Sequence, residues 1–175
     1  ERMFCRELCR THNLKFHAKK QNIRALAKRL KIGVEEAGRN VRYDYFQSLC
    51  DKFGYTKIAA GHTADDSAET FLLNAIRGAG LGGLSGIPPV RANIIRPLIE
   101  LNKNDILEFL HDYNLSFCHD LSNLDDDYNR NIIRNKVIPV LKKINSRALR
   151  NISRAGQNIN MIKTYIDDKV EELYN

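Results

Sequence analysis

Carboxylates and an arginine recur at helical spacing in residues 61–77. An apolar run precedes them, and Thr63 with Asp66 three residues later is a variant of the capping box that marks a helix start. At about 100° per residue, Asp66, Glu69 and Arg77 fall on one arc of this helix, opposite an apolar arc. Carboxylates at a helix start also complement the helix dipole without any further role. The whole arc favours a binding site, because ligands of open α/β sheets bind at the carboxyl ends of strands.

Arginines at two other places supply the opposite charge. In the helix predicted over residues 34–53, Arg42 falls within the apolar arc. A buried arginine without a partner is costly, so Arg42 either extends to solvent or points into a cleft that holds an anion. Arg130 and Arg134 lie one turn apart on one face of a later helix, which suits a clamp for a phosphate or a carboxylate. These arginines are candidate cationic partners for the acidic arc.

Strand-like and helical segments alternate along the chain, which predicts an α/β domain. Residues 57–61 are typical of a short, central, parallel strand, and residues 90–97 predict another strand. The glycine-rich residues 78–89 match neither common phosphate-binding motif and are interpreted as a loop with some substrate contact. The composition changes from about residue 146, where a final helix is predicted as a connector or a packing arm. Further helices are expected at residues 1–12, 23–30, 34–53 and 102–113.

The composition indicates a partner class. The 28 basic and 21 acidic side chains leave a net charge of +7, which favours a polyanion such as nucleic acid. No apolar run approaches the ~20 residues of a membrane helix. The four cysteines form no CxxC pair and fit a reduced, cytoplasmic setting. The chain begins at Glu1, within an amphipathic pattern and without an initiator Met, so we expect an internal piece of a longer protein.

Several motifs, in chain order, resemble the catalytic domain of the tRNA(Ile)-lysidine synthetase family. They are GHTADDSAETFLLNAIRG, GLSGIPP, IIRPL, the Asp120 and Ser122–Asn123 pair, and RNIIRNKVIPVLKKIN. Residues 35–43 are similar to that family's E-x-A-R-x-x-R-Y helix, with Gly38 where alanine is usual. The first motif alone occurs in PP-loop ATP pyrophosphatases generally, whereas the RN-x-x-R segment is specific. The resemblance covers about residues 3–146.

The resemblance implies a Rossmann-like PP-loop domain with three α/β/α layers over residues 1–145, and a helical linker at 146–175. Such enzymes use ATP and Mg²⁺ to adenylate the C2 carbonyl oxygen of the wobble cytidine in the isoleucine tRNA with a CAU anticodon. The ε-amine of L-lysine then attacks C2 and AMP leaves. The reaction needs cations for the phosphate and carboxylates for the ammonium.

The resemblance also assigns site residues by role. It makes Asp66, Glu69, Arg42 and Arg134 catalytic, Gly61 and His62 nucleotide-binding, Arg77 and Arg130 tRNA-binding, and Asp66 the candidate Mg²⁺ ligand.

One departure from the family pattern affects the expected activity. The S-G-G-x-D-S phosphate loop does not occur in this sequence. We therefore expect residues 1–175 alone to give no ATP–pyrophosphate exchange. Two alternatives stay open. One is a tRNA thiolase with the same His-x-x-Asp-Asp pattern, which the missing CxxC disfavours; the other is a non-catalytic, basic RNA-binding domain.

Overall fold

The computed structural model describes residues 1–118 and 129–174. The chain divides into two compact units, Glu1–Ile58 and Ala59–Asn175, and each is described by itself. The predicted loop residues Asp120, Ser122 and Asn123 lie outside the described residues.

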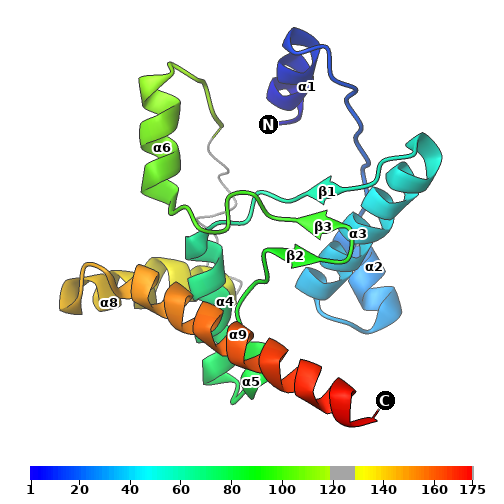
Figure 1. Ribbon diagram of the computed structural model, residues 1–175. Helices are drawn as coiled ribbons and strands as arrows, with labels where there is room; N and C mark the ends of the chain where they lie inside the picture. The colour runs from blue at the N-terminus through cyan, green and yellow to red at the C-terminus, as the bar shows by residue number, and fades with distance from the viewer. Residues whose placement is uncertain (119–128, 175) are drawn as a thin grey trace. The chain divides into compact units, whose positions relative to one another are not determined.

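The first unit is helical, with α1 (Arg2–Thr11), α2 (Ile23–Leu30) and α3 (Val34–Phe53) (Figure 1). The bounds of α2 and α3 are those that the sequence predicts. The side chain of Asn22 caps α2 by accepting a hydrogen bond from the backbone N–H of Ala25 at 3.0 Å. Gly54 ends α3 with a φ of 70°, a left-handed conformation that glycine adopts without a Cβ clash.

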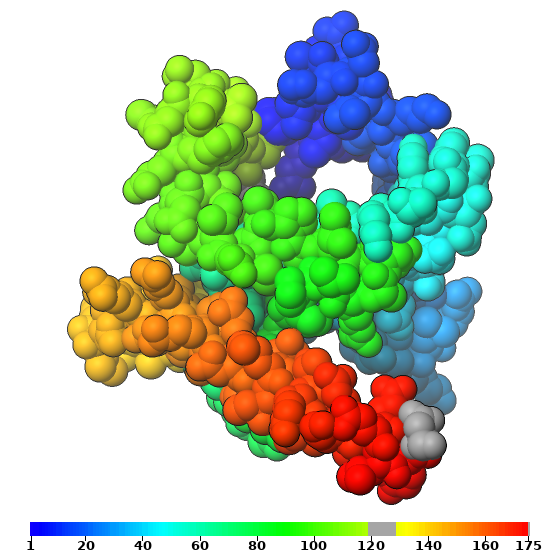
Figure 2. Space-filling view, in the orientation of Figure 1, coloured from blue at the N-terminus to red at the C-terminus, as the bar shows by residue number. Residues whose placement is uncertain are grey.

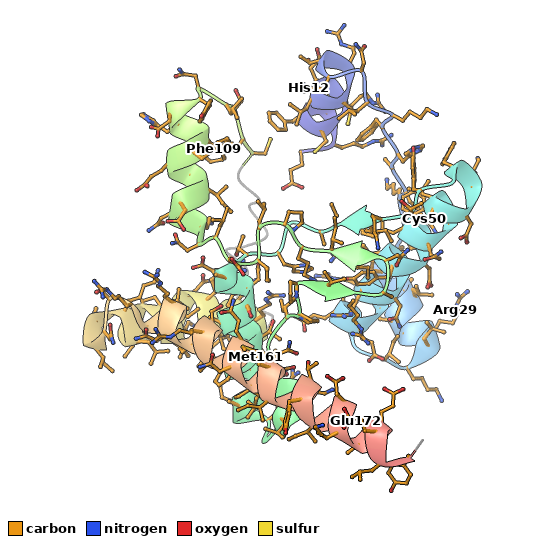
Figure 3. The ribbon with its side chains drawn as sticks, in the orientation of Figure 1. His12, Arg29, Cys50, Phe109, Met161 and Glu172 are labelled. Carbon is orange, nitrogen blue, oxygen red and sulfur yellow. The ribbon has the colours of Figure 1, made fainter. Side chains whose placement is uncertain are left out.

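Small side chains bring α2 and α3 of the first unit together. Ala27 of α2 and Ala37 of α3 are both buried, and the two helices pack on each other. Cys50, labelled in Figure 3, is buried nearer the end of α3. All four cysteines are free thiols.

A small sheet follows, made of β1 (Ile58–Ala59), β2 (Val90–Arg91) and β3 (Ile94–Ile95) in the order β1-β3-β2. The prediction of one strand over 90–97 was wrong, because Ala92, at a φ of 54°, turns the chain into an antiparallel hairpin. β3 lies in the middle of this sheet, so the prediction that residues 57–61 form a central strand was also wrong. Residues 60–64 do run parallel to 95–101, as the bonds Ala60 N–H to Ile95 O and Ala64 N–H to Leu101 O show.

The helices of the second unit assemble around α4 (Ala64–Ile76). α9 (Ala148–Tyr174) packs along α4 and α5, and Figure 2 shows it as an orange-to-red band across the visible face of this unit. The other helices are α5 (Leu81–Leu84), α6 (Lys103–Asp112), α7 (Asn129–Ile132), the π-helix η2 (Ile133–Val137) and α8 (Ile138–Ile144). The result is a mixed α/β arrangement with a small sheet and mostly helices, which is consistent with the predicted α/β/α domain followed by a helical extension. The domain boundary at residue 145 stays a prediction.

Close backbone approach fixes where α9 crosses the second unit. A Cβ on Gly156 would lie 3.4 Å from the carbonyl oxygen of Leu84 and 3.5 Å from Phe71 Cδ2. α9 therefore rests on the turn after α5. No helix of residues 1–118 or 129–174 combines the length and apolarity that a membrane crossing requires.

We predict that Gly86→Ala destabilises the protein more than Gly78→Ala. Both glycines have left-handed φ values, 70° and 74°, so alanine costs about 1–2 kcal/mol at either position. A Cβ at Gly86 would also lie 2.7 Å from Ser67 Oγ on the buried side of α4, whereas one at Gly78 meets nothing within 4 Å. Overpacking adds about 1–3 kcal/mol at Gly86. Urea unfolding of both variants measures the difference, and equal losses would contradict it.

Candidate active site

Asp66 is a residue of the candidate site and also belongs to the N-terminal capping box of α4. Its Oδ2 accepts hydrogen bonds from the backbone N–H of Thr63 at 2.8 Å and from Thr63 Oγ1 at 3.0 Å. The backbone N–H of Asp66 donates to Thr63 Oγ1 at 3.4 Å, which completes the predicted capping box. The cap therefore fixes one carboxylate oxygen of Asp66 and leaves Oδ1 for other partners.

The neighbouring carboxylate has a different role. Oδ2 of Asp65 accepts a hydrogen bond from the backbone N–H of Lys103 at 2.7 Å, in the first turn of α6. Asp65 thus ties the starts of α4 and α6 together, which matches the interpretation of a carboxylate that serves a helix end.

Glu69, one turn after Asp66, is only 2% exposed and accepts from two arginines. Arg134 donates from Nε to Oε1 at 2.6 Å and from Nη2 to Oε2 at 2.8 Å, a two-bond grip on the carboxylate. Arg130 donates from Nε to Oε2 at 2.8 Å. A carboxylate so deeply buried requires this compensation, because an unpaired buried charge is costly.

The same arginines reach Asp66. Oδ1 of Asp66 accepts from Nη2 of Arg130 at 3.0 Å and from Nη2 of Arg134 at 3.4 Å. We call these four residues, Asp66, Glu69, Arg130 and Arg134, the Arg–carboxylate cluster. Two negative and two positive charges make it formally neutral. The predicted arginine clamp therefore forms, and in this structure it holds two carboxylates of the chain itself.

The backbone around Arg134 departs from the α-helix. Arg134 lies in η2, and π-helical turns of this kind are frequent at functional sites. Pro139, at the start of α8, has no N–H to donate to the carbonyl of Asn135, so an ordinary α-helical ladder cannot run through this point. The altered turn connects α7 and α8 while Arg130 and Arg134 both face Glu69.

The charge state of Arg134 is fixed by its surroundings. The hydrogen bond with Glu69 raises the pKa of Arg134 above its ordinary value, burial lowers it, and the negative charges of Glu69, Asp66 and Asp65 raise it further. Arg134 therefore remains a guanidinium and serves as a fixed positive charge rather than as a proton donor.

A cavity of about 330 Å³ adjoins the cluster. Such a volume suits a small molecule or part of a larger ligand. Its lining joins α4 to the starts of α6, α8 and α9: Thr63, Asp65, Asp66, Glu69, Lys103, Arg134, Ile138, Lys142 and Leu149. A second cavity, of about 500 Å³, shares Asp65 and Leu149 with the first and extends along α9 to Gln157.

His62 has a partner that the sequence analysis did not single out. Arg96 is only 5% exposed, and its Nε donates to Nδ1 of His62 at 3.3 Å. The Nη1 of Arg96 donates to the carbonyl oxygen of Pro88 at 2.7 Å.

Three further predicted residues are exposed. Arg77 is the C-cap of α4 with an exposed side chain, and Gly61 is exposed between β1 and α4. Arg42 is exposed on α3 of the first unit. Their roles remain predictions. Among the described residues, no group of three side chains is arranged to hold a metal ion.

The protein-family model for the PP-loop domain matches residues 1–141 of this chain. The chain belongs to the PP-loop domain family. It is similar to the tRNA(Ile)-lysidine synthase of Caldanaerobacter subterraneus subsp. tengcongensis, with 43% identity over 98% of this chain and 37% of that protein. The synthases of Bacteroides thetaiotaomicron and Chlorobaculum tepidum are each 34% identical over 97% of the chain, and over 40% and 52% of their own lengths. The chain thus spans between about a third and a half of these curated relatives.

We predict that Glu69→Gln lowers the free energy of unfolding by about 2–4 kcal/mol. Glutamine has nearly the same shape, but it leaves two guanidiniums, each one-third exposed, without their buried countercharge. The matched control is Glu172→Gln on α9, which removes an exposed ion pair with Lys169 and should change stability by less than about 1 kcal/mol. Urea unfolding compares the two, and a loss at Glu69 no larger than the control would contradict a structural role for the cluster.

Proposed function

We propose that this chain catalyses lysidine formation: the ATP-dependent ligation of L-lysine to C2 of the wobble cytidine in the CAU anticodon of tRNA(Ile). The named relatives support the reaction, since they are similar over almost the whole chain. The observation that carries the proposal is the Arg–carboxylate cluster, which holds both signs of charge beside one cavity. The protein would act in the cytoplasm, where tRNA is available.

The carboxylates suit the nucleophile. The ε-amine of lysine is an ammonium in solution and must be bound, oriented and deprotonated before it can attack C2. Asp66 lines the cavity with its Oδ1 on the arginine side and its Oδ2 held by Thr63. Glu69 lies one turn deeper. We assign the ammonium to this pair.

The arginines suit the electrophile. Adenylation of the C2 carbonyl oxygen places a phosphate next to the reacting carbon, and guanidiniums bind phosphate oxygens in the same two-bond geometry as carboxylates. We infer an exchange of partners: the incoming phosphate takes a guanidinium, and the lysine ammonium takes the carboxylate that this guanidinium leaves. Each buried charge then keeps a partner of opposite sign, so the exchange avoids the cost of an unpaired charge.

ATP use follows from membership of the PP-loop family, but the described residues make only part of an ATP site. The S-G-G-x-D-S segment is absent from the sequence, so the triphosphate contacts have no assigned residues here. Mg²⁺ usually binds one or two carboxylates together with phosphate oxygens. Asp66 stays the candidate carboxylate, although both of its oxygens have protein partners in this structure.

Asp66→Asn should abolish lysine incorporation into tRNA(Ile) by the protein at its full encoded length. The asparagine amide has one oxygen, which cannot both accept from the Thr63 N–H and present a negative charge to an ammonium. Incorporation of labelled lysine into the CAU tRNA measures the effect. The matched control is Asp112→Asn, an exposed residue at the end of α6, which should incorporate lysine at the unmodified rate. Normal turnover by Asp66→Asn would remove this residue from the catalytic set.

A further inference from the structure

Arg96 is held by hydrogen bonds to two adjacent carbonyl groups. Its backbone N–H donates to the carbonyl oxygen of Pro89 at 2.9 Å, and its Nη1 donates to the carbonyl oxygen of the adjacent Pro88. Both acceptors precede the β2–β3 hairpin. Arg96 comes directly after β3, the second strand of this hairpin. An anchored guanidinium loses little further freedom when it makes one more hydrogen bond. Its bond to His62 is therefore set by the fold.

That bond determines the proton positions of His62. The Nε of arginine is only a donor, so Nδ1 of His62 must be the acceptor in the 3.3 Å bond. A neutral imidazole that accepts at Nδ1 carries its proton on Nε2. The second protonation, which would put a proton on Nδ1, would break this bond and face a buried cation.

The surrounding charges support the same assignment. Within residues 1–118 and 129–174, no carboxylate lies within ion-pair distance of the Arg96 guanidinium. Among these described residues the positive charge of the buried side chain has no ion-pair partner, and it acts on the ring that it contacts. Burial strengthens such an interaction because the local dielectric is low.

We propose that Arg96 is a positioning residue that fixes His62 as a neutral imidazole with its proton on Nε2. His62 then serves as a hydrogen-bond donor, and not as a base, toward an oxygen of the bound nucleotide. The proton position stands on the geometry alone, whereas the nucleotide as acceptor rests on the proposed function. Arg96 itself has no assigned contact with substrate.

The proton position can be measured directly in this chain without ATP or tRNA. Two-bond ¹H–¹⁵N correlation of ¹⁵N-histidine-labelled protein distinguishes a protonated from an unprotonated ring nitrogen, and a His62→Gln sample identifies the signals of His62. We expect an unprotonated Nδ1 and a protonated Nε2 at neutral pH. A protonated Nδ1, in either the neutral or the charged ring, would overturn the proposal.

Substitution of Arg96 tests the cause. Arg96→Met should convert the single tautomer of His62 into a mixture, while Arg91→Met, an exposed change on the same hairpin, should leave it single. A folded Arg96→Met protein with an unchanged tautomer would show that another group sets it, which overturns the role of Arg96. If Arg96→Met does not fold, Arg96→Lys and the unsubstituted protein decide the question by the same spectrum.

The donor role has its own readout. The side-chain amide N–H of His62→Gln stands near the place of Nε2, whereas that of His62→Asn stands near Nδ1. In the protein at its full encoded length, we expect His62→Gln to bind ATP about fivefold to tenfold more tightly than His62→Asn, the worth of one hydrogen bond. Equal affinities would overturn the donor role while leaving lysidine formation itself untouched.

Discussion

The buried carboxylate of Glu69 is the constraint on which the second unit depends. A charge at 2% exposure cannot rely on water, so the chain must bring countercharge from far along the sequence. Arg130 and Arg134 supply it from a segment more than 60 residues away. Their bonds fasten α7 and η2 to α4, and α9 packs over the same helix. One ionic requirement thus holds α7 and η2 against α4.

The Arg–carboxylate cluster is held in place by the fold, and its ion-pair partners can be exchanged for charged ligands. Asp66 is fixed by the cap of α4 through one oxygen, and the other oxygen shares the arginines with Glu69. A neutral set of two anions and two cations is stable by itself, yet each member is a ready partner for a charged ligand. A substrate pair of an ammonium and a phosphate presents the same two charges. This correspondence links the packing of the unit to the chemistry proposed for it.

Local signals in the sequence predicted the local structure well. Asn22, Gly54 and the Thr63–Asp66 box define helix ends because their hydrogen bonds are made within a few residues. The hairpin was missed because Val90–Ile95 alternates like one strand, and the turn at Ala92 contains no glycine. The helical wheel placed Glu69 on a cleft face, but it could not show that arginines cover this residue. That pairing, like the bond from Arg96 to His62, joins segments that are distant in the sequence. Such long-range contacts produce no periodic pattern of residue types.

The π-helical turn η2 has a consequence for how this segment tolerates change. A π turn amounts to one extra residue within an α-helical run. Removing one residue of η2 other than Arg134 would restore α-helical winding and rotate the preceding residues by about 100° about the axis. Arg130 would then turn away from Glu69, although every functional side chain was still present. The length of this segment is therefore more constrained than the identity of its exposed residues, and a single-codon deletion here is a more severe lesion than most substitutions.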